Sequence, residues 1–373
     1  MDYYISTEHL TVGYDGVPLI KDIEIGVRRG EILTLIGPNG SGKSTILKSM
    51  IRQLKLIAGT VVLDGRSIID MNERELSKKL AIVMTERMRA ELMTCWDVVA
   101  TGRYPYTGRL GILSDEDRKK VDDAISMVHA EDYAESPFDR ISDGQRQRLL
   151  LARAICQEPE VVVLDEPTSF LDVRHKLELL DVLKTMVRTR NVAVVMSLHE
   201  LDLAQKISDR VVCVANRRVD RYGTPEEIFQ DDYICEVYGI EKGSYNALFG
   251  TMEMEPAEGQ PKVFVIGGGG SGIPVYRALQ RNGIAFAAGI LQENDLDWPV
   301  AHALAAEVVS VPPYQMPDEA ALAHAKELME KCGSAVCCTE AFGECNKANL
   351  ELRNFAVSKS ILKEISDLYD QHK

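Results

Sequence analysis

The first two-thirds of the chain combine alternating and continuous patterns of hydrophobic residues. Residues 3–25 alternate apolar and polar positions around turn residues, which predicts antiparallel hairpin strands. Short apolar runs that predict further strands follow at 31–36, 59–63, 80–87, 161–164, 191–197 and 211–214. A mostly helical pattern occupies about 90–134. Together these patterns predict an α/β core that carries an antiparallel β subdomain and a helical insertion at about 86–145.

A second, shorter α/β pattern follows a polar stretch that contains Pro and Gly, at 254–261. Its strands are expected at 262–266, 284–291, 306–311 and 335–339, and its helices at 273–282 and 318–331. This order is typical of a small Rossmann-like domain. A chain of 373 residues also exceeds what one hydrophobic core usually serves. We therefore expect two domains, at 1–253 and 262–373, joined by a linker at 254–261.

A glycine-rich segment, GPNGSGKST at 37–45, lies between a predicted strand and a predicted helix. In that context the pattern G-x-x-x-x-G-K-[ST] predicts a phosphate-binding loop, because its backbone N–H groups converge at the positive end of a helix dipole. Lys43 is expected to contact the β- and γ-phosphates, and the Ser44 hydroxyl to ligate Mg²⁺. The predicted nucleotide-binding residues are Gly37, Pro38, Asn39, Gly40, Ser41, Gly42, Lys43, Ser44 and Thr45.

Polar residues also follow two of the later predicted strands. Asp165 and Glu166 come directly after 161–164, and His199 comes shortly after 191–197. Ligands of open α/β sheets bind at the carboxyl ends of strands, so we expect one acid to hold Mg²⁺ and the other to polarise an attacking water.

A further candidate anion site lies at the start of the predicted helix in ISDGQRQRLLLARAI, at 141–155. Ser142 is a good N-cap, and a helix N-terminus favours an anion. Tyr14, at the end of the first predicted strand, is a candidate for stacking on a nucleotide base, although a lone Tyr more often belongs to the core or the surface.

Composition narrows the class of partners. The formal net charge of −14 argues against nucleic acid as the main partner. The first residues lack a basic segment followed by an apolar one, and no run approaches the ~20 apolar residues of a membrane span. We therefore expect neither a secretory signal nor a membrane span, and we expect the eight cysteines to be reduced thiols of the cytosol.

Taken together, these motifs resemble the ATP-binding subunit of ABC transporters, over about residues 2–245. In this resemblance 37–45 is the Walker A loop, 142–145 the signature motif, and Leu171-Asp172 the D-loop. Asp165 and Glu166 match the Walker B Asp and the catalytic Glu. The remaining matches are Tyr14 to the adenine-stacking aromatic, His199 to the switch histidine, and Ser142, Gly144, Gln145 and Asp172 to further nucleotide-site positions.

The resemblance also implies partners and a reaction. The family hydrolyses ATP with Mg²⁺, as a dimer in which each P-loop meets the signature motif of the other subunit, so we expect a homodimer. The form ISDGQRQR and the segment ATGRYPYTG at 100–108 are similar to the subfamily that imports iron siderophores, haem or cobalamin. This implies a multi-span permease as partner, a substrate-binding protein met only indirectly, and a place at the cytoplasmic face of the membrane.

Two positions depart from the family pattern. Where family members carry a Gln that touches the metal, this chain has Thr85, with Glu86 next to it, so either Glu86 substitutes or the loop behaves differently. Asp143 replaces a signature Gly, and we expect its carboxylate to point away from phosphate, because a like charge there would oppose binding.

The last third of the chain leaves two alternatives open. Gly267, Gly269 and Gly272 satisfy G-x-G-x-x-G, and Glu293 has about the spacing of a ribose-binding acid, so the domain is either a dinucleotide site or a domain that needs no ligand. The cysteines of this domain are either buried strand residues or a site for iron, haem or redox sensing; they are Cys332, Cys337, Cys338 and Cys345.

We therefore expect the ATPase subunit of an importer for an iron chelate or cobalamin. One rival is a stand-alone soluble ABC ATPase, although the duplicated cassettes or long coiled-coil insertions typical of such proteins do not appear in the sequence. The other rival is an ATPase switch governed by a ligand-sensing C-terminal domain.

Overall fold

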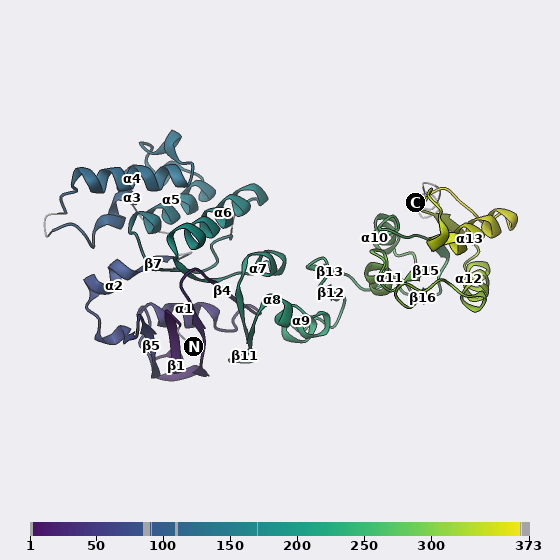
Figure 1. The fold of residues 1–373 in the computed structure, drawn as a ribbon, viewed down its shortest axis with the longest axis horizontal. Coiled ribbons are helices and arrows are strands. Elements are labelled where there is room, and N and C mark those ends of the chain that lie inside the picture. The colour runs from purple at the N-terminus through teal and green to yellow at the C-terminus, as the bar shows by residue number, and fades with distance from the viewer. Residues whose placement is uncertain are drawn as a thin grey trace. The chain divides into compact units, whose positions relative to one another are not determined.

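The computed structural model describes residues 3–84, 90, 92–108, 111–169, 171–365 and 367. These residues belong to two compact units, Met1–Phe229 and Gln230–Lys373 (Figure 1). Among the described residues, no helix combines the length and the apolar character that crossing a membrane requires.

The first unit is built on a mostly parallel sheet with the strand order β11-β10-β4-β9-β8-β7. Its strands are β4 (Ile32–Ile36), β7 (Leu80–Val83), β8 (Val161–Leu164), β9 (Ala193–Ser197), β10 (Arg210–Ala215) and β11 (Arg218–Gly223). The central strands β4, β8 and β9 are buried along their whole length, as continuous apolar runs predict. Strand β11 follows β10 as the second strand of a hairpin, and the chain turns between them at Asn216 and Arg217, which both have positive φ.

An antiparallel sheet with the order β2-β1-β5-β6 covers one side of this core, and β3 also pairs with β1. Its strands are β1 (Ile5–Tyr14), β2 (Val17–Ile23), β3 (Gly26–Val27), β5 (Ala58–Leu63) and β6 (Arg66–Ser67). Ile5 and Val61 of this sheet pack into one hydrophobic cluster with Leu33 and Val195 of the parallel sheet. Helix α1 (Lys43–Met50) contributes Ile46 to the same cluster.

Helices α3, α4 and α5 lie together at one end of the first unit, away from β1 and β5 (Figure 1). The helices of this unit are α2 (Glu73–Lys79), α3 (Cys95–Ala100), α4 (Asp115–Met127), α5 (Asp143–Cys156), α6 (Val173–Arg190), α7 (Leu201–Ile207) and α8 (Pro225–Ile228). Arg103, only 2% exposed, joins this group: it donates to Asp117 Oδ1 at 2.8 Å, to the Cys156 carbonyl at 2.8 Å and to Glu158 at 3.0 Å.

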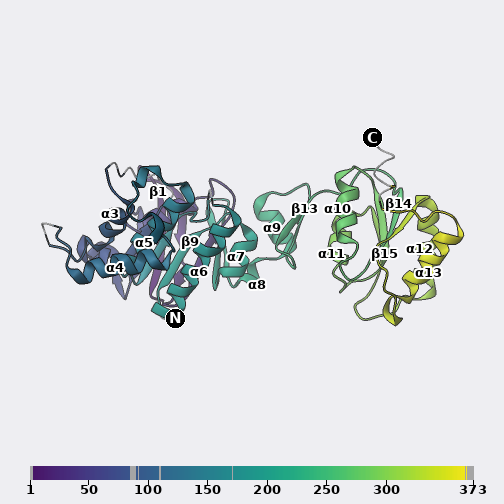
Figure 2. The ribbon, with the colours of Figure 1, turned by 90° about the horizontal axis from the view of Figure 1, so that it is seen from above.

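The second unit opens with helix α9 and a short hairpin and continues as a three-layer domain. Its sheet has the order β16-β15-β14-β17, so β14 and β17, which come first and last in the sequence, are neighbours. Figure 2 shows α10 and α11 on one face of this sheet and α12 and α13 on the other. The elements are α9 (Asp231–Tyr238), β12 (Ser244–Asn246), β13 (Thr251–Glu253), β14 (Val263–Ile266), α10 (Ile273–Arg281), β15 (Phe286–Gln292), α11 (Trp298–Leu304), β16 (Glu307–Val311), α12 (Glu319–Cys332), β17 (Ala335–Cys337) and α13 (Lys347–Ser358).

The predicted fold class is confirmed: a P-loop α/β core with an antiparallel β subdomain and a helical subdomain, followed by a small Rossmann-like domain. The pattern of the last third did not predict helices α11 and α13 or the hairpin of β12 and β13.

We expect Asp117→Asn to destabilise the helical subdomain at neutral pH by about 1–3 kcal/mol, because it leaves the buried Arg103 guanidinium with a weaker partner. Hydrogen bonds from Ser114, aided by Arg103, lower the pKa of Asp117 from 3.8 to about 2. The carboxylate therefore stabilises the fold fully above pH 3.8, and this contribution is lost as the pH falls towards 2.

The measurement is urea unfolding followed by Trp96 fluorescence in a Trp298→Phe background, so that the signal reports on the first unit alone. The difference between wild type and Asp117→Asn should narrow as the pH is lowered from about 4 to about 2. Asp123→Asn, on the exposed face of the same helix, is the control and should change little. A difference that stays constant with pH would contradict the assignment.

Candidate functional site

The glycine loop lies where the sequence predicts it, between the end of β4 and the start of α1. Gly42 precedes the helix with φ 107°, a left-handed conformation that only glycine adopts easily. Gly37 has φ 139°, and a Cβ at this position would lie 2.0 Å from the Val214 carbonyl of β10. The loop therefore requires glycine at both ends in order to stay close to the sheet.

Lys43 lies over this loop rather than in solvent. Its Nζ donates to the carbonyls of Gly37 at 2.7 Å and Pro38 at 3.1 Å, and the residue is only 5% exposed. Burial lowers the pKa of Lys43, while the carboxylates of Glu166 and Asp165 act in the opposite direction. A cation is thus held beside both the loop and the two acids.

Asp165 connects the loop to the neighbouring strands. It follows β8, is 4% exposed, and its Oδ1 accepts hydrogen bonds from Ser44 Oγ at 3.0 Å and from Ser197 Oγ at 2.7 Å. Mg²⁺ prefers oxygen ligands at about 2.0–2.1 Å. The Ser44 hydroxyl and the Asp165 carboxylate, whose oxygen atoms are 3.0 Å apart, could therefore bind one such ion together.

Glu166 and His199 meet at the carboxyl ends of β8 and β9. His199 Nε2 contacts Glu166 Oε1 directly, and Ser169 Oγ donates to the other carboxylate oxygen at 3.2 Å. Both side chains are about one-third exposed, so a water molecule and a ligand can reach them. Tyr14, the last residue of β1, contacts helix α1: its hydroxyl is 3.1 Å from Thr45 Oγ1. The Tyr14 residue is 51% exposed.

The signature segment forms a second group of site residues, at the start of α5. Ser142 and Gln145 form a capping box: Ser142 Oγ accepts from the Gln145 amide at 3.2 Å, and Gln145 Oε1 accepts from the Ser142 amide at 3.0 Å. The prediction of Ser142 as N-cap is confirmed. Asp143 accepts a hydrogen bond from Arg146 at 3.2 Å.

The D-loop lies next to this segment. A Cβ on Gly144 would meet Leu171 at 3.5 Å and His175 at 3.6 Å. Asp172 caps α6 by accepting from the His175 amide at 2.9 Å, and this bond is the main cause of its lowered pKa. The structure thus gathers the candidates in two groups, one around the P-loop and one around the signature segment. Thr85 and Glu86 lie outside the described residues.

Ser197, Thr168 and Glu200 are polar residues near the site that the sequence analysis missed. Thr168 Oγ1 donates to Glu200 Oε2 at 2.8 Å and is 1% exposed, which links the segment after β8 to the segment after β9. The register of the parallel sheet pairs Leu164 with Met196, so the next residues, Asp165 and Ser197, are neighbours. Strand alignment was therefore the signal that could have found Ser197.

The glycine loop of the second unit differs from the P-loop in what fills it. The Asp297 carboxylate, fully buried, accepts hydrogen bonds from the amides of Gly268, Gly272 and Ile273. Asp295 accepts from the Gly269 amide at 2.9 Å. These donors are the ones that a pyrophosphate would need. The geometry therefore favours a loop closed by the protein's own carboxylates over a dinucleotide site.

The candidate cysteines Cys332, Cys337, Cys338 and Cys345 do not form a group that could share a metal ion within the described residues. Among the described residues, the group of side chains that could share a metal ion is His9, Asp22 and Glu24 on the first unit, and it contains no cysteine. Burial raises the pKa of Cys332 to about 11 and that of Cys338 to about 12, which makes both thiols poor thiolate donors. The expectation of buried strand residues holds only in part: Cys332 is buried but ends helix α12, Cys337 is the half-buried end of β17, and Cys345 is exposed.

The first unit therefore has the architecture of a P-loop nucleotide hydrolase, with an added helical subdomain and a signature segment. Residues 20–169 match the family described as ABC transporter, and residues 286–369 match the MJ0874 family.

Relatives extend this match. The chain is 42% identical over 280 residues to an uncharacterized ABC transporter ATP-binding protein, MJ0873, of Methanocaldococcus jannaschii (74% of this chain, 96% of the relative). It is 37% identical over 248 residues to the probable siderophore transport system ATP-binding protein YusV of Bacillus subtilis (66% and 90%). It is 33% identical over 313 residues to the cobalamin import ATP-binding protein BtuD of Halobacterium salinarum (82% and 78%).

Among solved structures, the dimeric ATP-binding cassette MJ0796 bound to ADP and Pi has a TM-score of 0.53 at 25% identity, covering 59% of this chain and 98% of that one. The chain belongs to the ABC transporter ATP-binding proteins, and it is an ATPase.

We expect the second unit to bind no dinucleotide, because the Asp297 and Asp295 carboxylates would repel a pyrophosphate at the loop. Equilibrium dialysis of the whole chain against NADH, with saturating ATP present to fill the P-loop, should detect no retained NADH.

Asp297→Ala should destabilise the second unit by about 1–3 kcal/mol, since it leaves buried amides unpaired. Trp298 fluorescence in a Trp96→Phe background measures that loss.

Glu293→Ala is the matched control, since Glu293 is exposed and is the acid that a ribose would meet. It should leave both stability and NADH retention unchanged. Tight NADH binding that disappears in Glu293→Ala would restore the dinucleotide alternative.

Proposed function

We propose that this chain is the ATP-hydrolysing subunit of an ABC importer, and that it drives uptake of cobalamin or an iron chelate through a separate membrane permease. The observation that carries the proposal is the similarity to named import subunits of the family. In this proposal residues 1–253 supply the ATPase, 254–261 the linker and 262–373 an accessory domain. The chain would act at the cytoplasmic face of the membrane and meet a substrate-binding protein only indirectly.

Cobalamin is the substrate class that the similarity favours. The match to the cobalamin import protein runs over 313 residues, which is more than the predicted ATPase domain contains, so it includes part of the second unit. The match to the siderophore transport protein covers 248 residues. A cobalamin importer thus shares with this chain a region that lies outside the ATPase fold.

In the proposed cycle, two copies of the chain hold two ATP molecules head to tail. Each copy has one P-loop and one signature segment, and the structure gathers their residues in separate groups. A complete site would take Lys43 and the glycine loop from one copy and Ser142 and Gly144 from the other. The dimeric form of the cassette MJ0796 supports this arrangement.

Glu166 is the proposed general base. Its carboxylate would accept a proton from water as the water attacks the γ-phosphorus in line with the departing ADP oxygen. Ser169 and His199 hold that carboxylate in place, and His199 would also steady the γ-phosphate. Lys43 would balance charge on the phosphate oxygens. Tyr14 would stack on the adenine, and Gln145 and Asp172 would line the nucleotide from the signature side.

Ser44 and Asp165 are the residues that would hold Mg²⁺, because their oxygen atoms already lie 3.0 Å apart beside the P-loop. When bound, the ion supplies neutralisation of the phosphate charge.

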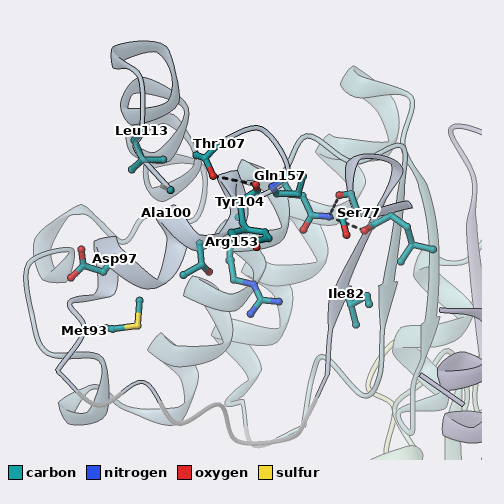
Figure 3. A pocket seen from close by; sticks show the side chains of 15 residues that line it. Ser77, Ile82, Met93, Asp97, Ala100, Tyr104, Thr107, Leu113, Arg153 and Gln157 are labelled. Atoms are coloured by element: carbon teal, nitrogen blue, oxygen red, sulfur yellow. Dashed lines mark hydrogen bonds between the residues drawn. The ribbon is translucent and has the colours of Figure 1, made fainter. Parts of the chain in front are cut away.

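A cavity between the α2–β7 region and the helical subdomain is the proposed seat of a cytoplasmic permease segment (Figure 3). Its volume is about 660 Å³, and its wall combines apolar and polar side chains. Tyr104 lies at this cavity and is 77% exposed, a degree of exposure that suits an aromatic anchor for a partner. Other residues that line the cavity and are labelled in Figure 3 are Ser77, Ile82, Met93, Asp97, Leu113, Arg153 and Gln157.

We expect Glu166→Gln to bind ATP and hydrolyse it about 10²–10⁴-fold more slowly, because an amide cannot accept the proton. Phosphate release measures turnover, and size-exclusion chromatography with ATP should show the variant held as a dimer. Lys43→Ala is the comparison that should lose ATP binding itself. A Glu166→Gln variant with normal turnover would refute the assignment of the base.

ATP-driven uptake of labelled cobalamin is expected in proteoliposomes that contain the chain with a permease encoded beside it. Tyr104→Ala should reduce that uptake about tenfold or more, because it removes an anchor of the interface. Ile69→Ala removes an exposed apolar side chain on the antiparallel subdomain and should have no effect. Uptake of a ferric siderophore in place of cobalamin would correct the substrate, and ATP hydrolysis indifferent to any permease would favour a stand-alone ATPase.

A further inference from the structure

Ser197 is the last residue of β9 and lies at the centre of the parallel sheet. On one side β9 pairs with β8, where Leu164 is level with Met196, and on the other it pairs with β4, where Leu35 is level with Ser197. Ser197 is therefore flanked by the strand that leads into the glycine loop and the strand that leads into Asp165. It is fully buried.

One hydroxyl makes two different hydrogen bonds at this position. Ser197 Oγ donates a hydrogen bond to Asp165 Oδ1 at 2.7 Å and accepts one from the backbone N–H of Glu166 at 2.9 Å. A serine hydroxyl has one donor and two acceptor lone pairs, so both bonds can form at once. The same oxygen atom thus touches the side chain of one acid and the backbone of the next.

Glu166 has a backbone conformation that needs such a support. Its φ is +49°, in the left-handed region that residues with a Cβ rarely adopt. Non-glycine residues with this conformation persist where the surrounding structure holds them, and they cluster at functional sites. The bond from the Glu166 amide to Ser197 holds the strained residue from the neighbouring strand.

We propose that Ser197 is a positioning residue for ATP hydrolysis. Its hydroxyl orients the Asp165 carboxylate and, through the same atom, the backbone that carries the Glu166 carboxylate. Asp165, which would hold Mg²⁺, and Glu166, which would act on water, are therefore held at fixed positions relative to each other. The proposal rests on the roles proposed above for Asp165 and Glu166.

Ser197→Ala removes both hydrogen bonds at once, whereas Ser197→Thr keeps the hydroxyl and adds a methyl group. The isolated full chain is assayed for ATP hydrolysis at varied ATP and Mg²⁺. We expect Ser197→Ala to lower kcat about 10–100-fold and to raise the half-saturating Mg²⁺ concentration about tenfold, the size of effect typical of groups that orient metal ligands. KM for ATP should change less than about threefold, and Ser197→Thr should recover most of kcat.

Two readouts do not depend on turnover. Electron paramagnetic resonance of Mn²⁺ with a non-hydrolysable ATP analogue should show metal binding weakened about tenfold in Ser197→Ala. Hydrogen exchange of the peptide that spans 161–169 should be faster in Ser197→Ala, because the Glu166 amide loses its acceptor. Thermal unfolding checks whether the whole unit has been destabilised.

Ser49→Ala is the matched control. Ser49 is also fully buried in the first unit, and within the described part of the chain its hydroxyl has no hydrogen-bond partner. It should leave kcat, the Mg²⁺ dependence and exchange at 161–169 unchanged. If Ser197→Ala does not fold, Ser197→Cys takes its place, and its weaker hydrogen bonds predict an intermediate kcat.

Wild-type kcat and Mg²⁺ dependence in a folded Ser197→Ala, or in a folded Ser197→Cys where that variant replaces it, would overturn the proposal. So would a loss of activity that parallels thermal destabilisation and is not recovered by Ser197→Thr. Glu166→Gln, measured beside them, separates this outcome from failure of the proposed site. If Glu166→Gln is inactive and Ser197→Ala is normal, only the positioning role is wrong, whereas normal turnover by Glu166→Gln refutes the site itself.

Discussion

The first unit depends on the alignment of parallel strands whose carboxyl ends meet at one edge. Because β4, β8 and β9 are buried and held in register, the residues that follow them have little freedom. This register places the glycine loop, Asp165 and Ser197 side by side although they are far apart in the sequence. The hydrogen bonds at Asp165 Oδ1 are the direct result, since they join a hydroxyl from the P-loop helix to a hydroxyl from β9.

The two units share a strand–glycine loop–helix geometry, but the loop has a different anion partner in each. Each has a glycine loop between the first strand of a parallel sheet and a helix, and such a loop presents amides that favour an anion. In the first unit the neighbouring charge is the cation of Lys43, which leaves the loop suited to phosphate. In the second unit the buried Asp297 carboxylate accepts hydrogen bonds from the loop amides of Gly268 and Gly272. The anion partner is thus decided by residues outside the glycine motif.

This difference explains what the sequence could and could not predict. Continuous apolar runs located β4, β8 and β9, because burial on both faces leaves a clear pattern. Motif spacing then predicted Lys43, Asp165, Glu166 and His199 as neighbours, because each follows a strand end. The role of Asp297 was hidden, since this residue precedes helix α11 and lies 25 residues after Gly272, so that no local sequence pattern indicates the contact. Ser197 was hidden in the same way, because only strand register reveals its partner.

Charge is the remaining constraint on the site. The chain as a whole is acidic, and Asp165 and Glu166 stand where a triphosphate would approach. Like charges repel each other, so such a site needs compensating cations. Lys43 supplies one of them, held between the loop carbonyls and the two acids. A divalent ion is the second compensating cation that the site suits, because the oxygen atoms of Ser44 and Asp165 lie together there. The same reasoning explains why the second unit, whose glycine loop is hydrogen-bonded to two carboxylates, is a poor place for a nucleotide.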